Sequence, residues 1–213
     1  MPRSRPLPPD DLADLRHFDR IWVRESASLR ILQDAGFNNA GMVPDLCFSA
    51  DFNSGTERHG TVLTDSVLPA TTAALRQRAT ETGARFLPMQ PLRALSYVKW
   101  AVNHAALSAA AADYYRALAG ANTVITGRFH AVIFCLLART PVLAVASNTS
   151  KIEAMLRDAL GSDSRMVEPG SLPPDVPPYS ADELARLSAY IATARAQAQA
   201  MFDAIAGDLR GTS

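Results

Sequence analysis

Short hydrophobic segments alternate with longer helix-like segments along most of this sequence, and this alternation constrains the fold more than any other feature. The short segments, such as residues 61–64, 123–126 and 141–145, are rich in β-branched residues, which is typical of strands. The stretches between them are too long for hairpins, so consecutive strands are expected to run parallel with right-handed crossovers. The sequence therefore predicts an α/β fold with an open, mainly parallel sheet and helices on both faces.

The individual elements are predicted from hydrophobic periodicity and from proline and glycine at the ends of segments. Gly36 and Gly83 are expected to end two of the helices, and residues 49–60 are expected to form a loop. The predicted strands are residues 20–23, 41–43, 61–64, 85–87, 123–126 and 141–145. The predicted helices are residues 26–35, 69–82, 105–119, 128–138, 148–160 and 180–209.

Proline-rich stretches divide the chain of 213 residues into three predicted parts. Residues 1–19 are expected to form an extended, proline-rich lead-in, and residues 20–168 are expected to form a Rossmann-like α/β domain. Residues 169–213 are expected to form a linker and a long amphipathic helix. The apolar stripe of that helix contains Leu184, Leu187, Ile191, Ala194, Ala198, Met201, Ile205 and Leu209.

Composition excludes several classes of partner. The chain has 21 basic and 21 acidic residues, so no net charge draws it to nucleic acid or to an anionic membrane. Its longest apolar run, residues 131–138, is far shorter than the roughly 20 residues of a membrane-spanning helix. The N-terminus lacks the pattern of a secretory signal, and Cys47 and Cys135 form neither a disulfide framework nor a metal-ligand spacing. We expect a cytoplasmic protein with two buried thiols and no metal site.

Ligands of open parallel sheets bind beyond the carboxyl ends of the strands. This rule selects five segments as candidate binding loops: residues 24–26, 65–66, 88–91, 127–130 and 147–151.

The strongest of these candidates is Gly127-Arg128-Phe129-His130. Glycine allows the chain to turn out of the strand, and the following helix start carries amide N–H groups and a partial positive charge. Arg128 offers a planar fork for a carboxylate or phosphate, and His130 can carry a proton near neutral pH. The segment is a candidate anion site with an acid–base group. An alternative interpretation is that Arg128 pairs with a nearby acid and that His130 is a structural histidine.

Two other segments offer weaker candidates. Ser147, Asn148 and Lys151 follow the next strand and could contact a second anionic group, although a plain capped helix start with a solvated lysine explains them equally well. Arg24 ends the first strand and either binds ligand or pairs with Glu25, Asp45 or a helix end.

Several well-known catalytic motifs are absent from the sequence. It contains no G-x-S-x-G, no G-x-G-x-x-G, no G-x-x-x-x-G-K-[ST] and no H-E-x-x-H. Serine hydrolase, dinucleotide dehydrogenase, P-loop NTPase and zinc protease functions therefore lose their main support.

Over about residues 20–160 the chain resembles the polysaccharide pyruvyl transferase family. The clearest part is residues 124–153, where a hydrophobic strand is followed by Arg128-Phe129-His130, an apolar helix, a proline-containing strand and Lys151-Ile152. Two earlier segments, residues 23–28 and 44–48, resemble the Arg-Glu-x-x-Ser and Pro-Asp-x-x-Phe segments of that family.

The resemblance implies transfer of a pyruvyl group from phosphoenolpyruvate to two hydroxyls of a sugar, which gives a cyclic ketal and inorganic phosphate. The acceptor would belong to a bacterial cell-surface polysaccharide or its lipid-linked precursor, which allows peripheral contact with a membrane. No cofactor is implied, because phosphoenolpyruvate is a co-substrate. The family fold is similar to the two-lobed GT-B architecture of many glycosyltransferases, and this chain would correspond to one lobe with a long C-terminal helix.

Carried onto this sequence, the resemblance makes Arg128 and His130 the catalytic pair. Arg128 would hold the carboxylate or phosphate of the donor, and His130 would protonate its methylene carbon. Lys151 and Arg24 would be secondary contacts to the donor, beside Gly127, Ser147 and Asn148. Because residues two apart on a helix point to nearly opposite sides, the pair can share a site only if the helix starts at or after His130.

The sequence also departs from the family, because no glycine- and asparagine-rich acidic loop precedes the predicted strand at Arg20. We therefore expect a second lobe, or another copy of the chain, to dock on the apolar stripe of residues 184–209. Two other functions stay open: a GT-B-like glycosyltransferase lobe that binds a nucleotide sugar, and a non-catalytic lobe that serves as a binding or assembly partner.

Overall fold

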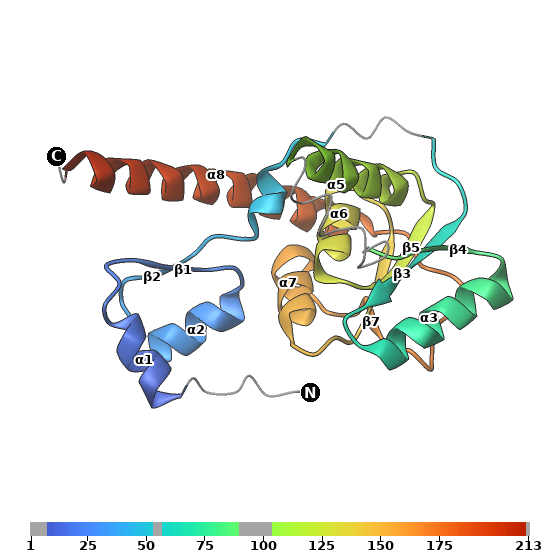
Figure 1. The fold of residues 1–213 in the computed structure, drawn as a ribbon, viewed down its shortest axis with the longest axis horizontal. Helices are drawn as coiled ribbons and strands as arrows, with labels where there is room; N and C mark the ends of the chain where they lie inside the picture. Colours follow the sequence, from blue (N-terminus) through green and yellow to red (C-terminus); the bar gives the residue numbers. More distant parts are fainter. Residues whose placement is uncertain (1–7, 53–56, 90–103, 212–213) are drawn as a thin grey trace. The chain divides into compact units, whose positions relative to one another are not determined.

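The computed structural model describes residues 8–52, 57–89 and 104–211, which form two compact units (Figure 1). Unit 1 is assembled from three separate stretches, Met1–Ala50, Glu153–Asp163 and Asp182–Ser213. Unit 2 consists of Asp51–Ile152 and Ser164–Ala181. These divisions do not coincide with the boundaries predicted after residues 19 and 168, which stay predictions.

Unit 2 contains the parallel sheet that the alternating pattern predicts, and its strand order is β4-β3-β5-β6-β7. All four strand pairs are parallel. The α/β prediction is therefore confirmed. The strands are β3 (Thr61–Ser66), β4 (Arg85–Leu87), β5 (Thr123–Gly127), β6 (Val142–Val145) and β7 (Met166–Val167).

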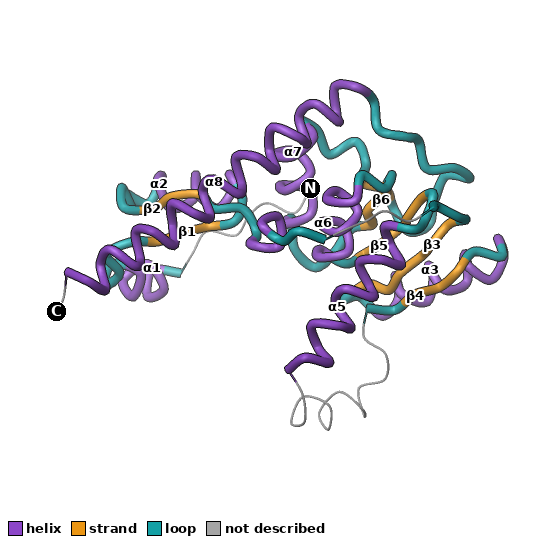
Figure 2. Tube along the Cα trace, turned by 90° about the horizontal axis from the view of Figure 1, so that it is seen from above, coloured by secondary structure: helices purple, strands orange, loops and turns teal. Residues whose placement is uncertain are grey.

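Helices cover both faces of this sheet (Figure 2). On one face, Leu75 and Ala79 of α3 (Pro69–Thr82) pack with the strand residues Leu63, Ile125 and Leu143. On the other face lie α5 (His104–Ala119) and α6 (Phe129–Ala138). They meet through aromatic rings: Tyr115 and Phe134 lie edge to face with ring centres 5.7 Å apart. All seven buried residues of α6 are apolar, which agrees with its uniformly hydrophobic sequence.

Unit 1 contains α1 (Pro9–Leu15), β1 (Ile21–Val23), α2 (Ser26–Asp34), β2 (Ala40–Met42) and the 3₁₀ helix η1 (Leu46–Ser49). It also holds most of α7 (Lys151–Leu160) and of α8 (Ala181–Gly211). Strands β1 and β2 pair in parallel with each other and form a separate two-stranded sheet.

Two hydrogen bonds from Ser26 join distant stretches of this unit. Its backbone N–H donates to Asp158 Oδ2 at 2.9 Å, and its hydroxyl donates to Asp158 Oδ1 at 2.6 Å. The carboxylate on α7 therefore caps the start of α2.

Most predicted elements are present, and the differences have local causes. The lead-in is not extended throughout, because Pro9 lies at a helix start, where proline is tolerated, and α1 continues to Leu15. Two further elements, η1 and the two-residue β7, are not predicted from the sequence, because they are too short to show a period. Gly83 ends α3 as predicted, with φ at +67°.

The predicted stripe on α8 is buried over only part of its length. Leu187, Ala194 and Ala198 are buried, whereas Ile205 and Leu209 are exposed. Docking of a further lobe or subunit on this helix stays a prediction.

Candidate functional site

The order of the strands singles out one place on the edge of the sheet. From β3 the chain passes to β4 on one side, and then returns to β5 on the other side of β3. The two directions diverge between the carboxyl ends of β3 and β5, where Ser66 lies opposite Gly127. Such a switch point is where open α/β sheets bind their ligands. Two predicted loops, residues 65–66 and 127–130, meet there.

Gly127 is needed because β3 and β5 approach closely. A Cβ atom at this position would lie 2.5 Å from Ser66 Cβ and 3.0 Å from Val145 Cγ2. Gly127 is not among the glycines with positive φ, so its backbone does not require the conformational freedom of glycine. Gly127 is the last residue of β5, and Arg128, which follows it, lies next to β3.

Arg128 is held at its backbone and at its guanidinium. Its backbone is extended, with φ at −108° and ψ at 126°, and its N–H donates to Thr126 Oγ1 at 3.0 Å. Its Nη2 donates to Asp65 Oδ2 in an ion pair whose side chains are 21% and 10% exposed. The predicted pairing of Arg128 with a nearby acid is thus present, and the acid is Asp65 of β3.

Hydroxyl groups of neighbouring residues on β3 and β5 lie beside this ion pair. Thr126 Oγ1 and Thr64 Oγ1 share a hydrogen bond of 2.5 Å, which links β5 to β3. Burial raises the pKa of the nearby Tyr114 hydroxyl, so this group is a neutral phenol over the whole physiological range. The groups next to the Arg128–Asp65 pair are therefore polar but uncharged.

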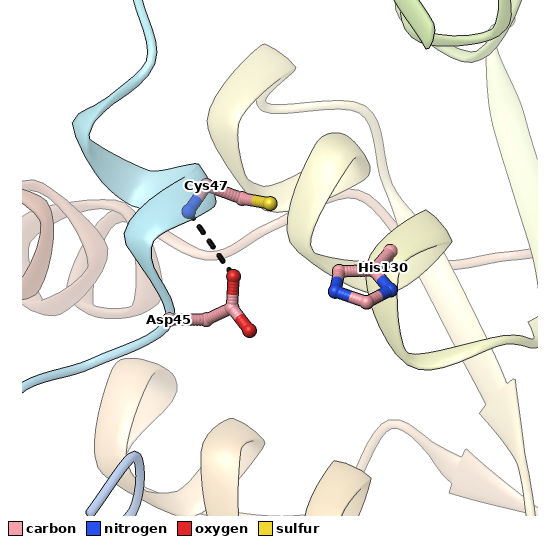
Figure 3. Close-up of side chains that lie close together, drawn as sticks. All are labelled: Asp45, Cys47 and His130. Carbon is pink, nitrogen blue, oxygen red and sulfur yellow. Dashed lines mark hydrogen bonds between the residues drawn. The ribbon is translucent and has the colours of Figure 1, made fainter. Parts of the chain in front are cut away.

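His130 is the second residue of α6 and is drawn in Figure 3 at the start of that helix. Its ring lies edge to face with the ring of Phe129, at 5.5 Å between centres. The predicted helix of residues 128–138 begins one residue later, at Phe129, so the condition for a shared site, a helix start at or after His130, is not met. Arg128 nevertheless lies outside the helix in extended backbone, so the rule for helical residues two apart does not apply to the pair.

A pocket of about 770 Å³ opens beside Arg128. Arg76 of α3 also lines it, with its guanidinium carbon 4.6 Å from the ring centre of Phe86. Two guanidinium groups and one carboxylate leave this pocket with a positive balance, which suits an anionic ligand. Among the described residues, the lining consists of Asp65, Ser66, Val67, Pro69, Thr72, Ala73, Arg76, Gln77, Thr80 and Arg128.

The segment after β6 does not line this pocket within the described part of the chain. The Ser147 hydroxyl donates to Asn148 Oδ1 at 3.2 Å, and Lys151 is the exposed first residue of α7. Their predicted contacts to a donor stay predictions.

Arg24 belongs to unit 1, whereas the residues described above belong to unit 2. Its Nη1 donates to Asp45 Oδ2 at 2.9 Å, so it pairs with one of the acids suggested by the sequence. Asp45 Oδ1 also accepts from the backbone N–H of Cys47 at 3.1 Å, as Figure 3 shows. The predicted contact of Arg24 with a donor stays a prediction.

Asp65 is a functional candidate that the sequence pattern alone does not identify. The pattern predicts residues 65–66 as a loop at the ligand edge and gives the acid no role. They are in fact the buried last two residues of β3. A charged residue at the end of a hydrophobic strand was the available signal. Of the remaining predicted loop, residues 90–91 lie outside the described residues.

Within the described ranges, no helix is both long and apolar enough to cross a membrane. Comparison with known proteins gave one family match: the family model for polysaccharide pyruvyl transferase matches residues 13–149. No match was found among curated proteins. The matched region contains the switch point, Arg128 and His130, and ends before Lys151. Because it covers well over half of the 213 residues, the chain belongs to the polysaccharide pyruvyl transferase family.

Proposed function

We propose that this chain transfers a pyruvyl group from phosphoenolpyruvate to a sugar of a cell-surface polysaccharide or of its lipid-linked precursor, with release of phosphate. The observation that carries the proposal is the position of Arg128. In a member of this family, an arginine held by an acid at the switch point lines a pocket with a positive balance. Phosphoenolpyruvate carries a carboxylate and a phosphate, and guanidinium groups bind both.

In the proposed reaction, Arg128 binds one anionic group of the donor. His130 gives a proton to the methylene carbon, and the electron pair of the double bond forms the new C–H bond. C2 then becomes electrophilic, and a sugar hydroxyl oxygen bonds to it. The second hydroxyl adds as the C–O bond to phosphate breaks, and the two hydroxyl protons pass to His130 and to the leaving phosphate. Ser147, Asn148, Lys151 and Arg24 are proposed as further donor contacts, and no cofactor is required.

The test mixes the full chain with phosphoenolpyruvate and a series of galactosides and mannosides. Phosphate release together with a gain of about 70 Da on the sugar is the expected result. The variant His130→Ala should lower kcat by about 10²- to 10⁴-fold, the range typical of a positioned general acid.

The matched control is His59→Ala. His59 is an exposed histidine of unit 2 whose Nε2 lies 3.7 Å from Glu57 Oε2, and it should tolerate the change without loss of rate. Unchanged turnover in His130→Ala would contradict its proposed role. Thermal stabilisation by a nucleoside diphosphate, and none by phosphoenolpyruvate, would instead support a glycosyltransferase lobe.

A further inference from the structure

Asp65 uses both of its carboxylate oxygens. Oδ1 accepts from the backbone N–H of Met89 at 2.9 Å, and Oδ2 accepts from Nη2 of Arg128. The side chain is only 10% exposed and belongs to β3, which has a neighbouring strand on each side. A carboxylate held at both oxygens on such a strand has little freedom to rotate. The carboxylate is therefore a hydrogen-bond acceptor of fixed position and orientation for the guanidinium that binds it.

Arg128, in turn, offers more donors than Asp65 accepts. A guanidinium has five N–H donors in a planar fork, and Asp65 is the one side chain among the described residues to which this fork is seen to donate. Nε is buried and has no partner within the described part of the chain. The orientation of the fork is thus set from one side, while the residue also lines the pocket.

We propose that Asp65 is a positioning residue, which orients Arg128 so that the rest of its fork faces the anionic group of the donor. This inference rests on the proposed function, because phosphoenolpyruvate is taken as the donor. Asp65 also lines the pocket, but its negative charge is opposed to a contact with an anionic donor, so its effect on the donor passes through Arg128. It also partly neutralises Arg128, so that the site favours an anion of matching shape over anions in general.

The competing explanation is that the pair only stabilises the fold. Loss of one partner of a largely buried pair destabilises a protein whatever its function, so a stability measurement alone cannot separate the two roles. Ligand preference can separate them. A misdirected guanidinium still attracts inorganic phosphate, but it loses the fit to phosphoenolpyruvate.

The experiment compares the wild-type full chain with Asp65→Ala, Asp65→Asn and Asp65→Glu. Calorimetric titration measures Kd for phosphoenolpyruvate and for inorganic phosphate, and phosphate release gives kcat and KM. Asp113→Ala is the matched control, because Asp113 pairs with Arg116 on the exposed surface of α5 in the same unit.

In Asp65→Ala we expect the preference for phosphoenolpyruvate over phosphate, and kcat/KM, each to fall by about 10- to 100-fold. The Kd for phosphate should stay unchanged or decrease. Asp65→Glu should regain part of the preference, and Asp113→Ala should keep all of it. A preference in folded Asp65→Ala within about twofold of wild type would overturn the proposal. If Asp65→Ala does not fold, Asp65→Asn decides in the same way, because its NH2 group replaces one of the two oxygens that accept from Met89 and Arg128 and cannot itself accept.

Failure of the proposed function looks different from failure of this inference. If the wild type neither binds phosphoenolpyruvate nor releases phosphate from it, the proposed function is wrong. The role of Asp65 is then decided by the side-chain NMR signals of Arg128. Restricted rotation of the guanidinium in the wild type and free rotation in the variant would support positioning, and identical signals would overturn it.

Discussion

The identity of residue 127 is determined by a residue on the neighbouring strand. Its backbone angles are open to any amino acid, but Ser66 on the adjacent strand occupies the space that a side chain would need. The sequence pattern suggested that Gly127 allows the chain to turn out of the strand, whereas the structure shows that the close approach of Ser66 requires a glycine. Strand pairing brings residues 66 and 127 together, and pairing is not visible in the order of residues along the chain.

Gly127→Ala is therefore expected to lower the free energy of unfolding by about 1–3 kcal/mol, the usual cost of overpacking. Denaturant titration measures it. Adding Ser66→Gly should restore part of the loss, because the two side chains compete for one space. Gly170→Ala is the control, since nothing lies within 4 Å of its Cβ position. Equal loss in the single and double variants would contradict this account.

Cys47 gives a prediction for alkaline pH. Burial, helped by a hydrogen bond and the negative charge of Asp45, raises the pKa of its thiol from 9.0 to about 12. The folded state therefore holds this proton more tightly than the unfolded state. The stabilisation is complete below pH 9 and is lost as the pH rises toward 12.

The free energy of unfolding should consequently fall more steeply above pH 9 in the wild type than in Cys47→Ala. Urea titrations at a series of pH values measure the two slopes. Parallel pH dependence in the two proteins would show that the thiol has an ordinary pKa.

At the scale of the elements, local signals predicted most helices and strands correctly. The bounds of α3 are the clearest example, because Pro69 and Gly83 mark both of its ends in the sequence. The partners of the elements were not predictable in this way. Arg128 was named from its own loop, whereas Asp65 lies 63 residues away and is identified only by the order β3-β5 in the sheet.

The cap that α7 provides for α2 is a contact between distant elements that can be tested. Asp158→Ala removes the acceptor for both Ser26 hydrogen bonds and should lower the free energy of unfolding by about 1–3 kcal/mol. Asp163→Ala removes an exposed ion pair with Arg157 and should cost less than about 0.5 kcal/mol. Thermal unfolding of both variants gives the comparison, and equal losses would contradict a capping role.

At the scale of the whole molecule, neither unit is a continuous stretch of the chain. Unit 1 draws its packing partners from both ends of the sequence: the ring of Phe48 lies edge-on to Tyr190, with centres 5.2 Å apart. Arg195 also donates to the Phe48 carbonyl at 3.3 Å. Composition and periodicity could not predict this arrangement, because they describe segments one at a time.

A fragment of residues 1–50 should therefore not fold alone. It lacks Asp158, Tyr190 and Arg195, and a chain of this size buries too little apolar surface without further support. Circular dichroism of the fragment should show little helix and no cooperative melting. A sharp melting transition in the isolated fragment would contradict the described division into units.

The capping of α2 by α7 also has a consequence for synthesis on the ribosome. Ser26 and Asp158 are 132 residues apart in the sequence, which at roughly 5–20 residues per second corresponds to about 7–26 s of translation. During that interval α1, β1, α2 and β2 have left the ribosome without the segment that completes them. Leu32 is the one buried side chain of α2, and Phe37 and Val43, which follow it, are buried as well, so during this interval the segment carries apolar side chains without all of their packing partners. Unit 1 is thus begun first and finished last, and its final folding step follows the synthesis of α8.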